Sequence, residues 1–136
     1  MPEKKTLERA RRDKREGKAP STQAGEFVRE EMEHIREGKH GARSSKQAIA
    51  IGLSKARRAG VVLQPPSRGQ ASAQTIKSAE REYAVGHSHT AHAKAPSKKR
   101  SQATTRALKR ESREAASPEA LSQQAHQAAT RRRRRH

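Results

Sequence analysis

The chain has 136 residues, with 32 Lys and Arg against 14 Asp and Glu, a formal net charge of +18. Leu, Ile, Val and Phe together supply only 14 side chains, far fewer than a globular chain of this length normally uses. Composition therefore argues against a single compact core and predicts that much of the chain is disordered when alone.

Several classes of protein are excluded by what the chain lacks. Cysteine is absent, so no disulfide framework, thiolate nucleophile or cysteine-type zinc site is expected. The densely charged first 18 residues do not resemble a secretory signal, and no apolar stretch is long enough to span a bilayer. There is no glycine-rich phosphate loop and only one aspartate, Asp13. We therefore expect a cytoplasmic protein with no membrane contact, no enzymatic activity and no cofactor.

The positive charge is concentrated in the later part of the sequence. Residues 1–37 carry 10 Lys and Arg against 9 Asp and Glu, whereas residues 38–136 carry 22 against 5. A polycation releases condensed counterions when it binds a polyanion, and nucleic acid is the commonest polyanion inside cells. The charge pattern therefore predicts a nucleic-acid partner, with a solubilising or inorganic-anion-binding tail as the alternative.

In chain order, residues 1–21 form a charged, partly helical segment whose only large apolar residue is Leu7. Residues 22–63 predict a helical hairpin domain, with the hairpin itself over about 22–60. Its second helix begins at a capping box made by Ser44 and Gln47 and ends at Gly60. The predicted hairpin core is Phe27, Val28, Met32, Ile35, Ile49, Leu53 and Ala56. This core is small, so we expect the hairpin to self-associate or to need a partner.

The remaining segments have weaker patterns. Residues 64–71 form a proline-containing linker, residues 72–86 can form a third helix, and residues 87–136 read as a disordered basic tail rich in Ala, Ser and Arg. His87, His89 and His92 could share a transition metal. No carboxylate or cysteine stands close to them, so we expect solvated histidines and no metal site.

The predicted fold is therefore mainly α: a short helical hairpin with a weaker third helix and largely disordered basic termini. The cations assigned to nucleic-acid binding lie on the hairpin and along the tail. They are Lys39, Arg43, Lys46, Lys55, Arg57, Arg58, Lys98, Lys99, Arg100, Arg106, Lys109, Arg110, Arg113, Arg131, Arg132, Arg133, Arg134 and Arg135.

Residues 39–60, KHGARSSKQAIAIGLSKARRAG, resemble the signature of a family of small basic bacterial proteins of unassigned function. The resemblance implies a bacterial source and a cytoplasmic setting, and it brings no reaction, ligand or partner. Gly52 stands where the family pattern has alanine. Because glycine weakens a helix by about 1 kcal/mol relative to alanine, its presence predicts a close backbone approach there.

Three functional hypotheses follow. The first is sequence-tolerant, non-enzymatic nucleic-acid binding of the nucleoid-associated or architectural kind, with duplex DNA favoured over RNA because only Phe27 and Tyr83 could stack on bases. The second is an interaction protein whose hairpin forms a homo-oligomer or docks a partner, while the basic tail serves solubility or RNA contact. The third is a disordered stress protectant.

Overall fold

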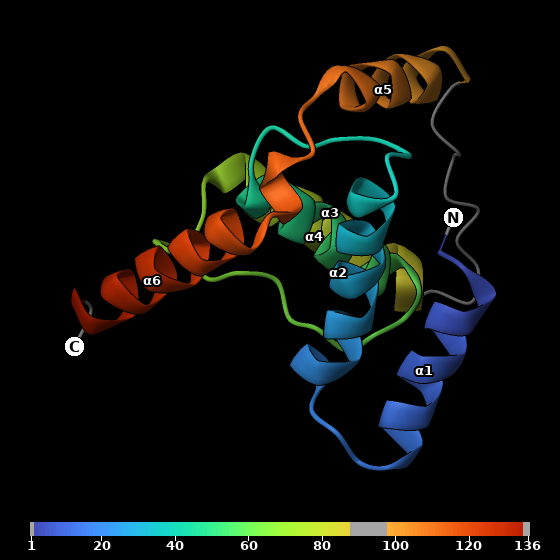
Figure 1. The fold of residues 1–136 in the computed structure, drawn as a ribbon. Helices are drawn as coiled ribbons and strands as arrows, with labels where there is room; N and C mark the ends of the chain where they lie inside the picture. Colours follow the sequence, from blue (N-terminus) through green and yellow to red (C-terminus); the bar gives the residue numbers. More distant parts are fainter. Residues whose placement is uncertain (1, 88–97, 135–136) are drawn as a thin grey trace. The chain divides into compact units, whose positions relative to one another are not determined.

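Helices account for the regular structure of the residues that the computed structural model describes, 2–87 and 98–134 (Figure 1). Within these ranges the only strand pairing is an isolated bridge between Arg68 and Ala71. The elements are α1 (Lys4–Arg15), α2 (Pro20–Arg36), α3 (Ser45–Arg58), α4 (Ala73–His87), α5 (Lys98–Arg110), the 3-10 turn η1 (Glu114–Ala116) and α6 (Pro118–Arg134).

The chain divides into two units. The first unit comprises Met1–Glu30 and Ala50–Ala95, and the second comprises Glu31–Ile49 and Pro96–His136. Each unit is therefore assembled from two separate stretches of sequence, and α2 and α3 each contribute residues to both.

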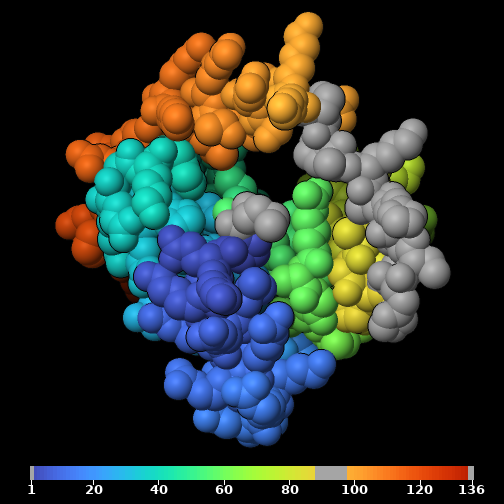
Figure 2. Space-filling model, turned by 90° about the vertical axis from the view of Figure 1, so that its right-hand side faces the viewer, coloured from blue at the N-terminus to red at the C-terminus, as the bar shows by residue number. Residues whose placement is uncertain are grey.

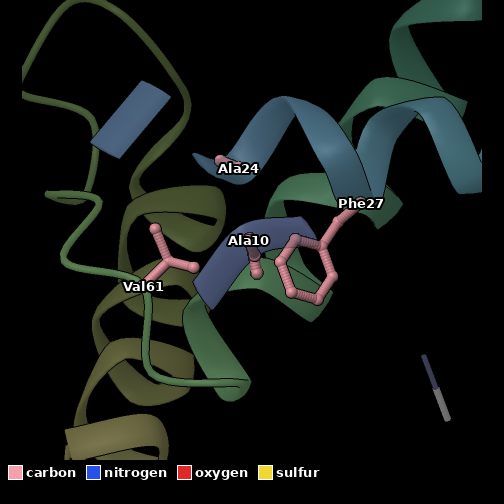
Figure 3. Close-up of a cluster of buried hydrophobic side chains, with 5 residues drawn as sticks. Ala10, Ala24, Phe27 and Val61 are labelled. Atoms are coloured by element: carbon pink, nitrogen blue, oxygen red, sulfur yellow. The ribbon is translucent and has the colours of Figure 1, made fainter. Parts of the chain in front are cut away.

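The core of the first unit is built mainly from small side chains. Ala10, Ala24, Phe27, Ala56 and Val61 are buried together, and Leu7, Leu53 and Leu63 pack against them. Figure 3 shows the Phe27 ring beside Ala10. Phe27 is fully buried and fills the space that the surrounding alanines leave, so one aromatic ring serves a core that would otherwise need several large residues.

Helix α1 is tied to α2 by a buried carboxylate. Glu30 Oε1 accepts hydrogen bonds from the backbone N–H of Glu3, at 2.6 Å, and from the hydroxyl of Thr6, at 3.1 Å. Glu3 itself makes no side-chain cap, so Glu30 supplies the acceptor and the negative charge that a helix N-terminus favours.

Two glycines let backbones meet within the first unit. A Cβ on Gly52 would lie 2.7 Å from Val28 Cα, and a Cβ on Gly86 would overlap the carbonyl oxygen of Arg57. The close approach predicted at Gly52 is confirmed. Gly86 lies inside α4 and makes possible the contact between α4 and the end of α3.

In the second unit, the connector between α2 and α3 is bonded to the C-terminal part of the chain. The N–H groups of Gly41 and Ala42 donate to the carbonyls of Leu108 and Ser112, at 2.8 and 3.0 Å. Ser45 Oγ donates to the carbonyl of Ala115. These bonds satisfy backbone groups at the end of α5 and in η1 that would otherwise face water.

The predicted division of the chain into a folded hairpin and disordered termini was therefore wrong. Residues 98–134, predicted to be disordered, contain α5, η1 and α6, and residues 4–15 form α1 as a complete helix. The hairpin is not the only folded part of the chain. The composition argument failed because it counted large apolar side chains, whereas burial here uses alanines such as Ala115 and Ala116 together with hydrogen-bonded polar groups. The stress-protectant hypothesis loses its premise of a disordered chain.

Replacing Gly52 by alanine tests the close helix contact. The added Cβ meets the Val28 backbone at 2.7 Å, so we expect Gly52→Ala to lower the free energy of unfolding by about 1–3 kcal/mol in spite of alanine's better helix propensity. Urea denaturation followed by circular dichroism measures the change. Gly25→Ala is the matched control, because a Cβ there meets nothing within 4 Å, and it should stabilise by about 0.5–1 kcal/mol. Equal effects of the two substitutions would contradict the contact.

Candidate nucleic-acid interface

Most of the Lys and Arg residues of α5 lie on one side of the helix. At 100° per residue, Lys98, Lys99, Arg106, Lys109 and Arg110 fall within an arc of about 120°; we call these five residues the α5 face. Apart from the half-buried Leu108, every residue of α5 is exposed. Figure 2 shows this segment, in light orange, at the molecular surface. Leu108 lies on the other side of the helix from the α5 face. Arg100, also predicted to bind, falls outside the arc.

The hydrogen bonds from Gly41 and Ala42 to the end of α5 bring further predicted cations to the same unit. Lys39 and Arg43 lie on the connector and are exposed. Arg113 lies three residues beyond the end of α5, and its Nη1 would be 3.4 Å from a Cβ on Gly38. Connector and α5 residues that are about 70 positions apart in sequence are thereby placed together.

Helix α6 carries the C-terminal arginines. Ser117 Oγ accepts the N–H of Ala120 at 3.1 Å, Pro118 is the first helical residue and Glu119 is in the first turn, so α6 begins with a capped N-terminus. Arg131 to Arg134 form the last turn and are exposed. Positive charges at this C-terminal end interact favourably with the negative pole of the helix dipole. Arg135 lies outside the described residues.

The predicted cations of α3 have different environments. Lys46 is exposed and belongs to the second unit, whereas Lys55, half-buried, and Arg58, exposed, belong to the first. Arg58 Nη2 lies 3.9 Å from Glu82 Oε1 on α4. At that distance an exposed ion pair contributes little to stability.

Arg57 is buried and serves the fold. Its Nε donates to the carbonyl of Leu63 at 3.2 Å and its Nη2 donates to the carbonyl of Gln64 at 3.1 Å. Burial lowers the pKa of the Arg57 guanidinium below its usual value, and the nearby charge of Glu82 partly opposes that shift. Because only 7% of Arg57 is exposed, we leave it out of the proposed binding surface.

Helix α1 holds cations that the sequence analysis did not select. It contains seven Lys and Arg against Glu8 and Asp13, and Asp13 is buried with its Oδ1 3.4 Å from Lys18 Nζ. The signal was hidden because charge was summed over residues 1–37, where the glutamates of α2 balance the cations of α1.

The histidines considered for metal binding are only partly described. His87 ends α4, its ring stacks on Tyr83 with centroids 4.1 Å apart, and its Nδ1 lies 2.9 Å from the Tyr83 carbonyl. His89 and His92 lie outside the described residues.

No family model, no curated protein and no solved structure matches the chain. The resemblance seen in residues 39–60 therefore stays a prediction. Among the described helices, none combines the length and the apolar character needed to cross a bilayer.

Separate substitutions of Arg57 and its exposed neighbour Arg58 test whether Arg57 stabilises the fold. Arg57→Gln leaves the carbonyls of Leu63 and Gln64 without their charged donor, so we expect a loss of about 1.5–3 kcal/mol in the free energy of unfolding. Arg58→Gln removes the same charge from an exposed position and should change stability by less than about 0.5 kcal/mol. Thermal and urea unfolding of both variants measure the difference. If Arg57→Gln left the free energy of unfolding unchanged, Arg57 would not have the stabilising role assigned to it here.

Proposed function

We propose that this protein binds nucleic acid without enzymatic action and with little sequence preference, duplex DNA being the favoured form. The observation that supports the proposal is the α5 face, five exposed cations on one side of a helix. Guanidinium and ammonium groups bind phosphate oxygens through charge-assisted hydrogen bonds. A helix that is already formed also avoids the entropy cost of ordering a tail on binding.

The dimensions of α5 suit a duplex. Its 13 residues extend over about 20 Å, and the major groove of B-DNA, about 12 Å wide, admits an α-helix between its two phosphate rows. Lysine and arginine contacts to phosphate position a protein on the duplex without reading sequence. The exposed arginines of α6 and the connector cations Lys39 and Arg43 would add further phosphate contacts.

Single-stranded nucleic acid is less favoured because the chain offers few stacking surfaces. Its aromatic residues are Phe27 and Tyr83. Phe27 is fully buried, and Tyr83 is half-buried and stacked on His87. Proteins that hold single strands stack successive bases on exposed aromatic rings, and neither ring is placed for that purpose.

The alternative of partner docking or self-association through the hairpin has less support. Its key residues were Phe27, Met32, Ile49 and Leu53. Phe27 and Met32 are buried in the chain itself, and Ile49 and Leu53 are half-buried. Little of the surface of these four side chains is therefore exposed for contact with a second protein.

Neutralising part of the α5 face tests the proposal. The triple variant Lys99→Gln, Arg106→Gln, Arg110→Gln removes three expected phosphate contacts. Because log affinity falls with log salt by about 0.9 per contact, the slope should decrease by about 2.7, and the affinity for a random-sequence duplex at moderate salt should fall on the order of tenfold or more. Gel-shift or anisotropy titrations at several salt concentrations measure both quantities, and an RNA competitor compares the two polymers.

The control removes the same number of charges elsewhere. Arg68, Lys77 and Arg81 are exposed in the first unit and were not assigned to binding. The variant Arg68→Gln, Lys77→Gln, Arg81→Gln should keep most of the affinity and nearly all of the salt slope. If both variants lose affinity equally, net charge rather than the α5 face governs binding. If the unmodified protein does not bind duplex at low salt, the proposed function is wrong.

A further inference from the structure

Three side chains with metal-ligand chemistry meet where α2 passes into the connector. Glu31, His34 and His40 each offer one ligand atom, and these atoms all lie within 4.8 Å of one another. His40 Nε2 and Glu31 Oε2 are 3.3 Å apart. The Glu31 side chain is 1% exposed and that of His40 is 15% exposed. All three residues belong to the second unit.

Local backbone structure explains why these residues meet. Glu31 and His34 are three residues apart on α2 and therefore share one face of the helix. Gly38, with φ +79°, ends the helix in a Schellman motif, in which Lys39 N–H donates to the His34 carbonyl at 3.0 Å and Gly38 N–H donates to the Ile35 carbonyl at 3.1 Å. This turn reverses the chain and returns His40 to the face that carries Glu31 and His34.

The two ring nitrogens of His40 both face acceptors. Nδ1 lies 2.8 Å from the carbonyl oxygen of Gly41, which can only accept a hydrogen bond. Nε2 faces the Glu31 carboxylate at 3.3 Å. A neutral imidazole has a single N–H and can donate to only one of these two acceptors. A cation bound by Nε2 and Glu31 makes both contacts favourable in the tautomer with its hydrogen on Nδ1.

The separation between His40 and Glu31 fits a metal ion. In a tetrahedral site with bonds of 2.0–2.1 Å to nitrogen and oxygen, neighbouring ligand atoms are about 3.3–3.4 Å apart. The Nε2–Oε2 separation of 3.3 Å matches one edge of that tetrahedron. The bond from Nδ1 to the Gly41 carbonyl is also the outer contact that metal-bound histidines commonly make, because it fixes the tautomer and the orientation of the ring.

We propose that Glu31, His34 and His40 bind a divalent transition metal of the zinc class, with water at the fourth position. Two imidazoles and one carboxylate are a ligand set that zinc accepts in proteins. A bound ion would be held between the buried Glu31 carboxylate and the two imidazoles and would join the end of α2 to the connector. This departs from our expectation of no metal, which rested on the absence of cysteine and on the separate cluster of His87, His89 and His92.

The experiment measures zinc binding by the full-length protein after treatment with a chelator. Isothermal titration with zinc chloride should give one ion per chain, and cobalt chloride should give the intense visible absorption of a tetrahedral site. His34→Ala and His40→Ala should each weaken zinc binding by more than about 100-fold, since losing even an outer contact of a ligand costs 10–100-fold. Circular dichroism of each variant checks that the helices remain.

Two controls separate this site from other histidines. His126→Ala changes an exposed histidine on α6, and the variant His87→Ala, His89→Ala, His92→Ala removes the other cluster; both should bind zinc as the unmodified protein does. Zinc binding that survives in His40→Ala, or that is lost only in the triple variant, would overturn the proposal.

A long-range ¹H–¹⁵N spectrum supplies a second readout that does not depend on folding of a variant. Zinc should shift the Nε2 signal of His40 and one ring-nitrogen signal of His34, and leave the Nδ1 hydrogen of His40 in place. If His40 carries hydrogens on both nitrogens and zinc moves neither signal, the site is an ion pair and the proposal is wrong.

Discussion

Close approach of backbones takes the place of large side chains in this protein. The chain has too few Leu, Ile, Val and Phe for a conventional core, and glycine sits where backbones meet: Gly52 against Val28, Gly86 against the Arg57 carbonyl, and Gly41 against the Glu111 carbonyl. Each contact needs the absence of a Cβ, and the core of the first unit contains the small side chains of Ala10, Ala24 and Ala56. Dispersion between closely packed atoms is individually small but adds up over such contacts, so each unit folds with few bulky residues.

Local sequence signals were sufficient to place helix ends, because a cap depends on residues only three or four positions apart. The N–H of Gln47 donates to Ser44 Oγ at 3.1 Å as the capping box predicts, although the Gln47 amide oxygen accepts from Arg43 N–H rather than from Ser44. Gly17, Gly38 and Gly60 adopt the positive φ typical of helix ends, whereas Gly86, which the sequence also offers as a helix end, lies inside α4. The order of residues 98–134 could not be predicted in this way. It depends on bonds such as Gly41 to Leu108, whose partners lie 67 positions apart, and composition contains no information about them.

In the candidate sites, too, nearby residues in the sequence predict some features, whereas others depend on contacts that the sequence pattern does not show. Charge runs indicated most of the exposed cations, and the helical period then separates the α5 face from Arg100 once a helix is known to exist there. Arg57 could not be distinguished from Arg58 in sequence, since its burial depends on the carbonyls of Leu63 and Gln64. The Glu31 and His34 pair was detectable from its spacing on α2. The return of His40 depends on the turn at Gly38, and helical spacing alone does not predict that turn.

Acidic side chains are buried more often than basic ones in the part of the chain that the structure describes. Asp13, Glu30 and Glu31 are buried, at 4%, 2% and 1% exposure, whereas Arg57 is the only Lys or Arg buried among the described residues. The acids are thus used partly for internal bonds, at the start of α1 and beside His40, and the cations are left outside. Folding therefore increases the positive character of the surface relative to the unfolded chain, in which every acid is solvated. A surface of this kind favours rapid, salt-sensitive association with phosphate polymers, and it arises from the same buried carboxylates that hold the helices together.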